Sequence, residues 1–316
     1  MKAVAITRFG ERPEVMEVPV PTPGPGQVLV RMYAAGLNPF DWKVTDGLLK
    51  DVVPHAFPLV MGNDGAGVIE AVGEGVTELR PGEEVYGQFM SLSTGGGSFA
   101  EFAVAKAGSV ARAPRGLTLS QAAAVPTASM TAYNLVKEAR VDAGQTVLVV
   151  GATGGVGQGV VQFADAQGAR VVATATADLA PLVRELGADE VIDHTASPVA
   201  DQVRALHPEG LDVLFDLVQD AGGFEAATDL LRPGGMALTT QGVADVDALA
   251  EREVHAVNFQ NSASVVLLET LADLLDAERY RVRVDVEVPL DQAAEAVARN
   301  RAGLARGKTV IKIAGT

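Results

Sequence analysis

A glycine-rich stretch with the sequence GATGGVG occupies residues 151–157 and directly follows the apolar run TVLVV at 146–150. An apolar, β-branched run indicates a buried strand, and glycines after it suit the start of a helix. The fingerprint of dinucleotide-binding folds, G-x-G-x-x-G, would place glycines at 152, 154 and 157, whereas this chain has alanine at the first of these positions. Alanine can replace that glycine if its φ angle stays negative. The other two glycines let the backbone approach a pyrophosphate and let the helix pack closely against the strand.

The loop therefore predicts a dinucleotide cradle, in which amide groups at the helix start bind the phosphates. The alternative is a glycine-rich turn that holds no ligand. The residues assigned to the cradle are Ala152, Thr153, Gly154, Gly155, Val156 and Gly157.

The end of the next expected strand bears on the identity of the dinucleotide. NAD-binding units carry an aspartate or glutamate there, which takes the ribose hydroxyls. This chain has Thr174, Ala175 and Thr176 instead, so the acid that would repel a 2′-phosphate is missing. NADPH is therefore the expected cofactor, with Thr174 and Thr176 near its adenosine end. No lysine or arginine lies between residues 171 and 183 to bind the extra phosphate.

The elements that position the loop follow a doubly wound pattern. Between residues 145 and 258, apolar strands alternate with helices expected near 155–167, 179–186, 198–206 and 223–231, which indicates an α/β fold with a parallel sheet. Val218 and Gln241 follow the fourth and fifth strands, where ligands bind in such sheets. Residues 1–118 are instead rich in short strands and Pro/Gly turns, which is typical of a barrel-like or sandwich domain.

Composition limits the classes of function. A length of 316 residues suits two domains, and a formal net charge of −15 argues against a nucleic-acid partner. The absence of cysteine excludes disulfides and thiolate metal sites, and the four histidines are scattered without ligand spacing. The sequence shows neither a signal-peptide pattern nor an apolar run of about 20 residues. We expect a cytoplasmic protein without membrane or metal partners.

Several segments occur together in a family-specific order. They include NPFDWKVTDG (38–47), FPLVMGNDGAGVIEAVGEGVTELRPGEEVYG (57–87), GSFAEFAV (97–104), LTLSQAAAVPTASMTAYNL (117–135) and LGADEVID (186–193). In these segments the chain resembles the zinc-free branch of the medium-chain dehydrogenase/reductase superfamily, the quinone oxidoreductase or ζ-crystallin-like enzymes. The resemblance implies a GroES-like catalytic domain at 1–118, completed by about 265–316, and a Rossmann domain at 119–264.

The zinc enzymes of that superfamily carry a cysteine ligand where this chain has Asn38, and a histidine–glutamate pair where it has Asn63 and Asp64. The resemblance therefore implies metal-free hydride transfer from NADPH to a quinone or an α,β-unsaturated carbonyl. It places Asn38 and Lys43 near the substrate carbonyl, which Asn38 would orient, while Lys43 would act as electrophile or proton source. The alternative for Lys43 is a solvated lysine paired with Asp41, and Asp64 is expected to organise its turn.

The resemblance also marks further cofactor contacts. Thr131 corresponds to a threonine that meets the nicotinamide-side phosphate, although it could instead bond the backbone of its own helix. Phe259 lies in the segment that closes over the nicotinamide, where packing is an equal alternative. Relatives often carry tyrosine at position 194, and His194 could stack on adenine, donate to a 2′-phosphate or simply lie at the surface. Weaker candidates for binding that phosphate are Lys308, Arg184 and Arg306.

These observations predict a zinc-independent, NADPH-dependent reductase of a small quinone or enone. Two alternatives stay open: an enoyl or tailoring reductase for a larger polyketide or acyl substrate, and an NADPH-binding protein without turnover. The strand MALTTQ, residues 236–241, is expected near the edge of the parallel sheet. Pairing of two such edges would give a homodimer.

Overall fold

The computed structural model of the protein describes residues 1–313 and divides into two compact units. The first unit comprises Met1–Met130 together with Ala263–Thr316, and the second comprises Thr131–Ser262. A β-rich GroES-like unit and a parallel-sheet Rossmann unit confirm the fold class expected from the sequence.

The boundary between the units lies at Met130 rather than at residue 118. Helix α2 (Leu119–Ala123) packs on strands β3 (Gln27–Leu37) and β5 (Asp64–Val72), and so belongs to the first unit. Gly36 permits this close packing, because a Cβ there would lie 2.2 Å from the carbonyl oxygen of Ala123. The Ala-rich stretch that looks like the start of the Rossmann domain therefore covers the GroES-like sheet.

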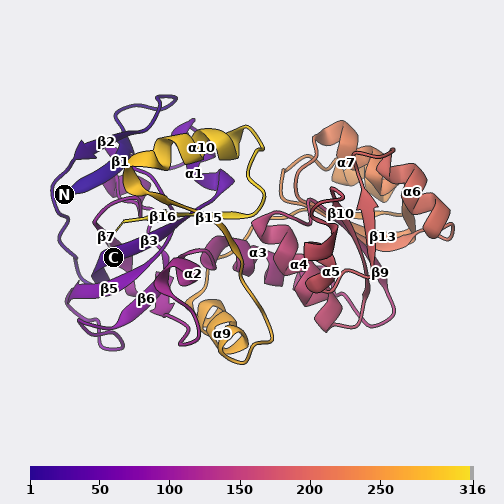
Figure 1. The fold of residues 1–316 in the computed structure, drawn as a ribbon. Helices are drawn as coiled ribbons and strands as arrows, with labels where there is room; N and C mark the ends of the chain where they lie inside the picture. The colour runs from indigo at the N-terminus through magenta and orange to yellow at the C-terminus, as the bar shows by residue number, and fades with distance from the viewer. Residues whose placement is uncertain (314–316) are drawn as a thin grey trace. The chain divides into compact units, whose positions relative to one another are not determined.

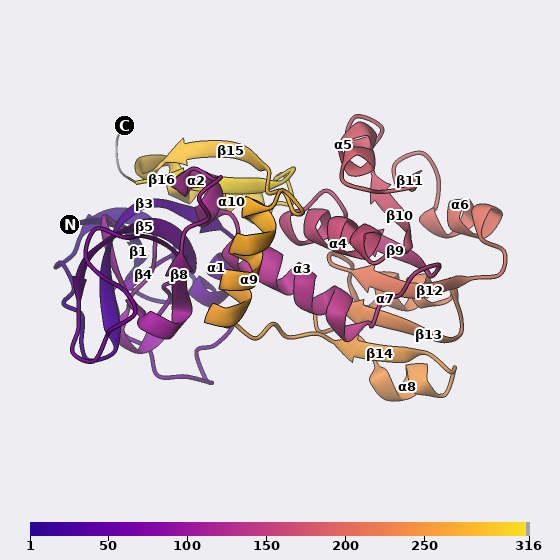
Figure 2. The same ribbon diagram turned by 90° about the horizontal axis from the view of Figure 1, so that it is seen from below.

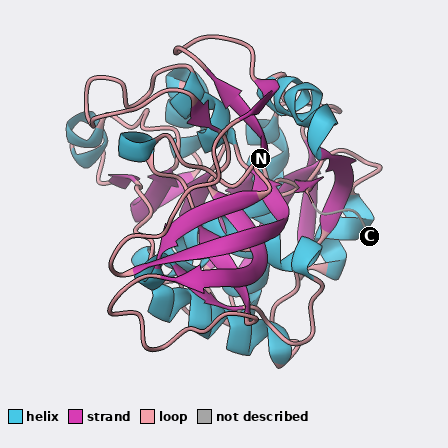
Figure 3. Ribbon diagram, turned by 90° about the vertical axis from the view of Figure 1, so that its left-hand side faces the viewer, coloured by secondary structure: helices cyan, strands magenta, loops and turns pink. Residues whose placement is uncertain are grey.

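The first unit is built on curved, mostly antiparallel strands (Figure 3). Its larger sheet runs in the order β15-β16-β3-β5-β6-β8, with β7 also paired to β3, and its smaller sheet runs β2-β1-β4. Besides β3 and β5, the strands are β1 (Lys2–Ile6), β2 (Glu14–Glu17), β4 (Leu59–Val60), β6 (Glu84–Gln88), β7 (Phe102–Lys106), β8 (Val110–Arg112), β15 (Val284–Pro289) and β16 (Lys308–Lys312). Thr309 of β16 lies opposite Leu37 of β3, so the end of the chain returns to its first unit.

Short helices cover the sheets of this unit. Helix α9 packs on β8, and α10 packs on α1. The hydroxyl of Tyr86 donates a hydrogen bond of 2.5 Å to the carbonyl oxygen of Leu268, which ties α9 to β6. The helices are α1 (Pro39–Thr45), α2, α9 (Val265–Asp276) and α10 (Ala293–Arg301), with 3-10 turns η1 (Leu92–Thr94), η2 (Ala107–Ser109) and η3 (Leu290–Gln292).

The second unit is a parallel sheet in the order β11-β10-β9-β12-β13-β14, flanked by helices (Figures 1 and 2). Its central strands are continuous apolar runs because both faces are covered, and Leu148, Val172 and Leu214 are buried in one cluster. Helix α3 (Pro126–Glu138) leads into it from the first unit. The elements are β9 (Thr146–Val150), α4 (Gly155–Ala166), β10 (Arg170–Ala175), α5 (Ala180–Glu185), β11 (Glu190–Asp193), α6 (Val199–Leu206), β12 (Leu211–Asp216), α7 (Ala221–Thr228), β13 (Leu231–Thr239), α8 (Val246–Ala250) and β14 (His255–Asn258).

The strand expected near the edge of the parallel sheet lies next to the end strand. Strand β13, which contains MALT, lies between β12 and β14, and the end strand is β14. Met236 pairs with His255, and Thr239 pairs with Asn258. Strand β14 spans four residues with polar residues at both ends, so it lacks the apolar run that marks the other strands.

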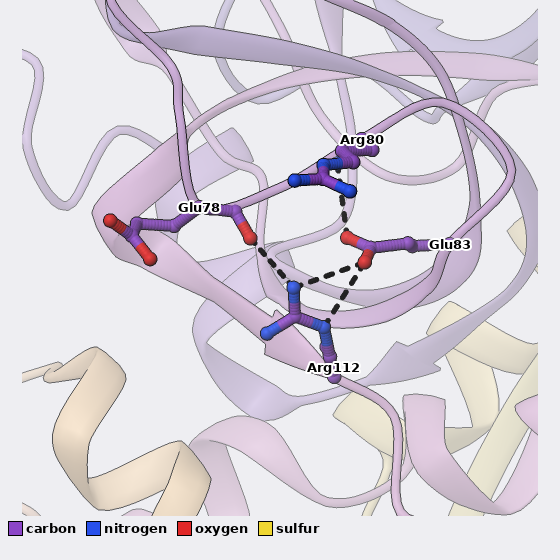
Figure 4. A network of polar contacts seen from close by, with 4 residues as sticks. All are labelled: Glu78, Arg80, Glu83 and Arg112. Carbon is purple, nitrogen blue, oxygen red and sulfur yellow. Dashed lines mark hydrogen bonds and ion pairs between the residues drawn. The ribbon is translucent and has the colours of Figure 1, made fainter.

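A surface network joins β8 to the turn before β6 (Figure 4). The Arg112 guanidinium donates to Glu83 at 3.0 and 3.3 Å and to the carbonyl oxygen of Glu78 at 2.7 Å. The backbone N–H of Arg80 donates to the same Glu83 carboxylate at 3.0 Å. These hydrogen bonds, led by that from Arg112, hold the pKa of Glu83 below its ordinary value. The network fixes a turn that the sequence marks with LRPGEEV.

Within residues 1–313, no helix combines the length and the apolar character that crossing a membrane requires.

Candidate active site

The glycine-rich loop joins β9 to α4, as the sequence predicts. Gly151 adopts a φ of +86°, in the left-handed region that favours glycine, whereas Ala152 is buried and keeps a φ outside that region. Gly151 therefore forms the tight turn that the fingerprint assigns to its first glycine, which explains why alanine is tolerated at 152. Gly157 is required by close packing, because a Cβ there would lie 2.2 Å from the carbonyl oxygen of Gly151.

Gly154 has no side chain, so the backbone N–H groups in the first turn of α4 remain accessible to a ligand. It is the N-cap residue, with φ −73° and ψ 167°, and no side chain caps the first turn. A Cβ at Gly154 would have the carbonyl oxygen of Gly151 as its near neighbour, at 3.4 Å. Amide groups of a first helical turn lack intrahelical partners and carry partial positive charge, which suits a phosphate. The loop therefore fits a pyrophosphate, and Thr153, Gly155 and Val156 lie half-buried along it.

Thr174 supports this loop from inside the fold. Its side chain is 5% exposed, and its hydroxyl oxygen accepts the backbone N–H of Gly151 at 3.0 Å. Thr174 thus fixes the turn of the loop, and its contact with the cofactor stays a prediction. Thr176 is half-buried at the end of β10 and donates a hydrogen bond of 2.6 Å to Asp178.

Four other expected residues follow the carboxyl ends of the parallel strands, at the same edge of the sheet as the loop. Val218 follows β12 and is exposed, and His194 follows β11 and is also exposed. Gln241 follows β13 and donates to the carbonyl oxygen of Leu217 at 2.7 Å. Phe259 follows β14 and is half-buried. Ligands bind at this edge in open α/β sheets, so the structure gathers these residues where a dinucleotide would lie.

Thr131 lies on α3 and is 7% exposed. Its assignment to a phosphate remains an expectation from the resemblance.

A cluster of buried polar side chains lies in the first unit, where β3 ends and β5 begins. Asp41 and Asp64 are each 0% exposed, and Lys308 is 6% exposed. Burial of three ionisable groups costs several kcal/mol unless charges and hydrogen bonds compensate it, and such groups gather at functional sites. We call this set the buried polar cluster; its members are Asn38, Asp41, Asn63, Asp64, Gln88, Thr127 and Lys308.

Asp64 is the centre of the cluster. Its Oδ2 accepts from the Asn38 side chain and from the backbone N–H of Thr127, each at 2.9 Å. Its Oδ1 accepts from the Thr127 hydroxyl at 2.5 Å and from the Asn63 amide at 3.4 Å. Burial raises its pKa, while Lys308 and the hydrogen bonds act in the opposite direction. Every neighbour donates, so Asp64 is bound as a carboxylate at the N-terminal end of α3, where the helix dipole favours it.

The Asp41 carboxylate accepts hydrogen bonds from two backbone segments next to Asp64, at Asn38 and at Asn63. Its Oδ2 accepts the backbone N–H of Asn38 at 2.8 Å, and its Oδ1 accepts that of Asn63 at 2.9 Å. Burial raises the pKa of Asp41 to about 7, and the nearby charge of Asp64 acts in the same direction. Asp41 is therefore the member of the cluster whose charge changes near neutral pH.

The pKa of Asp41 predicts a pH dependence of stability. Because folding raises this pKa from 3.8 to about 7, the folded protein binds more protons than the unfolded chain between these values. The free energy of unfolding contributed by Asp41 therefore falls as pH rises from about 4 to about 7, by at most roughly 4 kcal/mol. We expect the stability of wild type relative to Asp41→Asn to decrease over this interval. Urea unfolding of both proteins at pH 5, 6, 7 and 8 measures it, and a difference that stays constant contradicts it.

The side chain of Asn38 is bound inside the protein, and its expected role in orienting a carbonyl stays a prediction. It is 4% exposed, and its nitrogen donates to Asp64 at 2.9 Å and to the carbonyl oxygen of Gly36 at 3.3 Å. Its oxygen accepts from the Lys308 ammonium at 2.8 Å. Both amide hydrogens are thus bound inside the protein. Asn38 connects the buried cation to the buried carboxylate.

Lys308 is likewise bound inside the protein. Its ammonium donates to Asn38 and, at 3.2 Å, to the carbonyl oxygen of Leu37. Burial lowers its pKa, while Asp64 and Asp41 act in the opposite direction. A buried ammonium held in this way balances charge in the first unit, and its assignment to the 2′-phosphate stays a prediction. Arg184 and Arg306 are exposed, and their assignment to the 2′-phosphate stays a prediction.

Sequence reasoning missed Gln88 and Thr127. Gln88 ends β6 directly opposite Asp64, and its amide nitrogen donates to the Thr127 hydroxyl at 2.8 Å. Thr127 follows Pro126 at the start of α3. The helix-starting Pro126 is a sequence signal that places Thr127 in the first turn of α3, but the partner strand of Gln88 is not readable without the sheet register.

Lys43 lies on α1 and is half-buried, with its Nζ 5.8 Å from the centre of the Trp42 ring. Asp41, its suggested partner in the alternative reading, directs its carboxylate to two backbone N–H groups. A chemical role for Lys43 therefore stays a prediction.

The polar cluster does not fit a zinc ion. Zinc sites in proteins use cysteine, histidine and carboxylate ligands. Here the carboxylates are filled by hydrogen-bond donors, and an ammonium group lies among them, which would repel a second cation. In the described part of the chain, no group of three or more histidine, cysteine or acidic residues is arranged to hold a metal ion.

Comparisons with known proteins agree with this architecture. Residues 24–115 match the model of the alcohol dehydrogenase GroES-like domain, and residues 186–311 match a zinc-binding dehydrogenase model. The chloroplast envelope quinone oxidoreductase homolog of Arabidopsis thaliana is 30% identical over 95% of this chain and 93% of that protein. The 2-methylene-furan-3-one reductase of Solanum lycopersicum is 32% identical over 98% and 79%. The solved structure of mycobacterial Rv1454c complexed with NADPH superposes with a TM-score of 0.86 at 28% identity, covering 99% of both chains.

The fold, the open helix start and these relatives define a nicotinamide-dependent oxidoreductase with GroES-like and Rossmann units. The chain belongs to the quinone oxidoreductase family of the medium-chain dehydrogenase/reductase superfamily.

Proposed function

We propose that the protein is a zinc-independent, NADPH-dependent reductase of a small quinone or α,β-unsaturated carbonyl. The observation that carries the proposal is the open start of α4 between two fixed glycines, Gly151 and Gly157, followed by a strand that ends without a carboxylate. Two relatives are named for reduction of a quinone and of a methylene-furanone, which supports the acceptor class.

In this proposal the protein binds the cofactor and determines where the proton for the acceptor comes from. A bound nicotinamide nucleotide supplies a hydride for the electron-poor carbon of the acceptor. The amide groups at the start of α4 hold the phosphates, and Thr174 fixes the turn before them. The half-buried members Asn63 and Gln88 of the buried polar cluster are carboxamides, which do not release a proton. In this proposal the proton for the acceptor oxygen comes from Lys43 or from solvent.

The preference for NADPH rests on the end of β10. Thr174, Ala175 and Thr176 occupy it, and the next acid, Asp178, accepts the hydroxyl hydrogen of Thr176. An acid that bound the ribose hydroxyls would favour NADH instead. Cofactor oxidation should therefore be faster with NADPH than with NADH, by about tenfold or more in kcat/KM.

The test is oxidation of NADPH and of NADH, followed by absorbance, with 1,4-benzoquinone and with cyclohex-2-enone. Faster oxidation of NADH would overturn the cofactor preference and assign Asp178 to the ribose. Tight binding of NADPH without reduction of either acceptor would favour a binding protein without turnover. A protein treated with chelator should keep its full activity, and loss of activity would contradict zinc independence.

A second candidate is an enoyl or tailoring reductase for a larger acyl substrate. The loop after α1 exposes Leu48 by 54%, Val52 by 71% and Phe57 by 38%, which favours a longer apolar ligand. Higher kcat/KM for a long-chain enone than for cyclohex-2-enone would support this candidate.

A homodimer formed through the end strand β14, and a cytoplasmic location, complete the proposal. The strand offers backbone groups to a second copy along its outer side. Light scattering tests the dimer, and a monomer at micromolar concentration would contradict it.

A further inference from the structure

Two carboxamides at the border of the buried polar cluster keep accessible acceptor atoms. Gln88 and Asn63 are both half-buried, and their amide nitrogens donate to the hydroxyl oxygen of Thr127 at 2.8 and 3.1 Å. Among residues 1–313, no other residue donates a hydrogen bond to their side-chain oxygens. Within residues 1–313, no buried side-chain oxygen or nitrogen lacks a partner, so these two oxygens reach solvent. The two amides therefore form one accessible polar surface around Thr127.

The hydrogen bonds fix which way both carboxamides point. Thr127 donates its hydroxyl hydrogen to Asp64 at 2.5 Å, so its oxygen is left to accept. Gln88 and Asn63 must then turn their nitrogens toward Thr127 and their oxygens away. The Asn63 nitrogen also donates to Asp64 at 3.4 Å, which uses its second hydrogen. The surface thus offers two acceptor oxygens and one remaining N–H, on Gln88.

This pattern matches a ligand hydroxyl group. An oxyanion requires several donors, and the surface has one. Hydrogen bonds polarise one another along a chain, so donation toward the Thr127–Asp64 pair makes the amide oxygens better acceptors. A hydroxyl can donate to one of these oxygens and accept the N–H of Gln88. Resting on the proposed reductase function, we propose that Gln88 and Asn63 are specificity-determining residues that select acceptors bearing a hydroxyl group.

The test compares two acceptors that differ by one hydroxyl, cyclohex-2-enone and 4-hydroxycyclohex-2-enone, with NADPH. Wild type should show about a tenfold higher kcat/KM for the hydroxylated enone, since one or two hydrogen bonds contribute about 0.5–1.5 kcal/mol each. Gln88→Met keeps the side-chain length and removes both polar atoms. It should lower the preference for the hydroxylated enone over cyclohex-2-enone at least threefold. Gln167→Met, the same change at the exposed residue that follows α4, should leave the preference unchanged.

Two results would overturn the inference: an equal preference in wild type and Gln88→Met, or an equal loss on both enones. If wild type reduces neither enone, the proposed function is wrong. The hydroxyl subsite is then tested by ligand binding without turnover. Calorimetric titration with 4-hydroxycyclohexanone and cyclohexanone should then still show tighter binding of the hydroxylated ketone in wild type but not in Gln88→Met. Equal affinities in wild type would overturn the subsite.

Discussion

A Lys308→Met variant should lose about 3–5 kcal/mol of unfolding free energy, which is typical when one partner of a buried charge set is removed. Methionine fills a similar volume but leaves the carboxylates of Asp64 and Asp41 without a buried cation. It also leaves the Asn38 side-chain oxygen and the carbonyl oxygen of Leu37 without their donor. Urea unfolding at neutral pH measures the loss.

Lys312→Met is the matched control, because it makes the same change on the same strand. The Lys312 ammonium lies 3.7 Å from Glu287 at the surface, so its loss should cost about 1 kcal/mol or less. Adding Asp64→Asn to Lys308→Met should recover part of the loss, with a coupling energy of about 1–3 kcal/mol. Equal stabilities of Lys308→Met and Lys312→Met would show that the ammonium does not balance the cluster.

The nucleotide loop could be predicted from the sequence because its determinants are local. The apolar strand, the glycines and the following helix occupy residues 146–166, and each part is recognisable from its neighbours. The sequence also explains why alanine can stand at position 152, since alanine is allowed there if its φ angle is negative. Only the structure shows that Gly151 adopts the left-handed conformation of the turn. Resemblance added the family, which the comparisons confirm.

The buried polar cluster could not be predicted because its members meet through the fold. Lys308 reaches Asn38 across the pairing of β16 with β3, near opposite ends of the chain. Gln88 reaches Thr127 through the register of β5 with β6 and the start of α3. Lysine side chains are most often exposed, so residue type alone predicts a solvent-exposed Lys308, whereas the structure buries it. The assignment of α2 to the Rossmann domain was wrong for the same reason, since the packing of α2 on β3 depends on Gly36.

Gly154→Ala and Gly157→Ala should separate cofactor binding from folding. At Gly154 the backbone is extended, and a Cβ would lie 3.4 Å from its neighbouring oxygen, so alanine fits the fold. The free energy of unfolding should change by about 1 kcal/mol or less. The same methyl group occupies the space through which a pyrophosphate would approach the first turn of α4. The Kd for NADPH should therefore rise at least tenfold.

Gly157→Ala should instead damage the fold itself. Its Cβ would lie 2.2 Å from the carbonyl oxygen of Gly151 and 2.6 Å from the Cα of Ala152, so the backbone of α4 must move away from β9. Overpacking of this kind costs about 1–3 kcal/mol, and it displaces the amides that would bind phosphate. Gly222→Ala, in the first turn of α7 with the nearest atom 3.9 Å from its Cβ, controls for the loss of a helical glycine and should not lower stability. Thermal unfolding and NADPH fluorescence titration measure the two effects. Unchanged NADPH affinity in Gly154→Ala would mean that the dinucleotide does not lie against this loop.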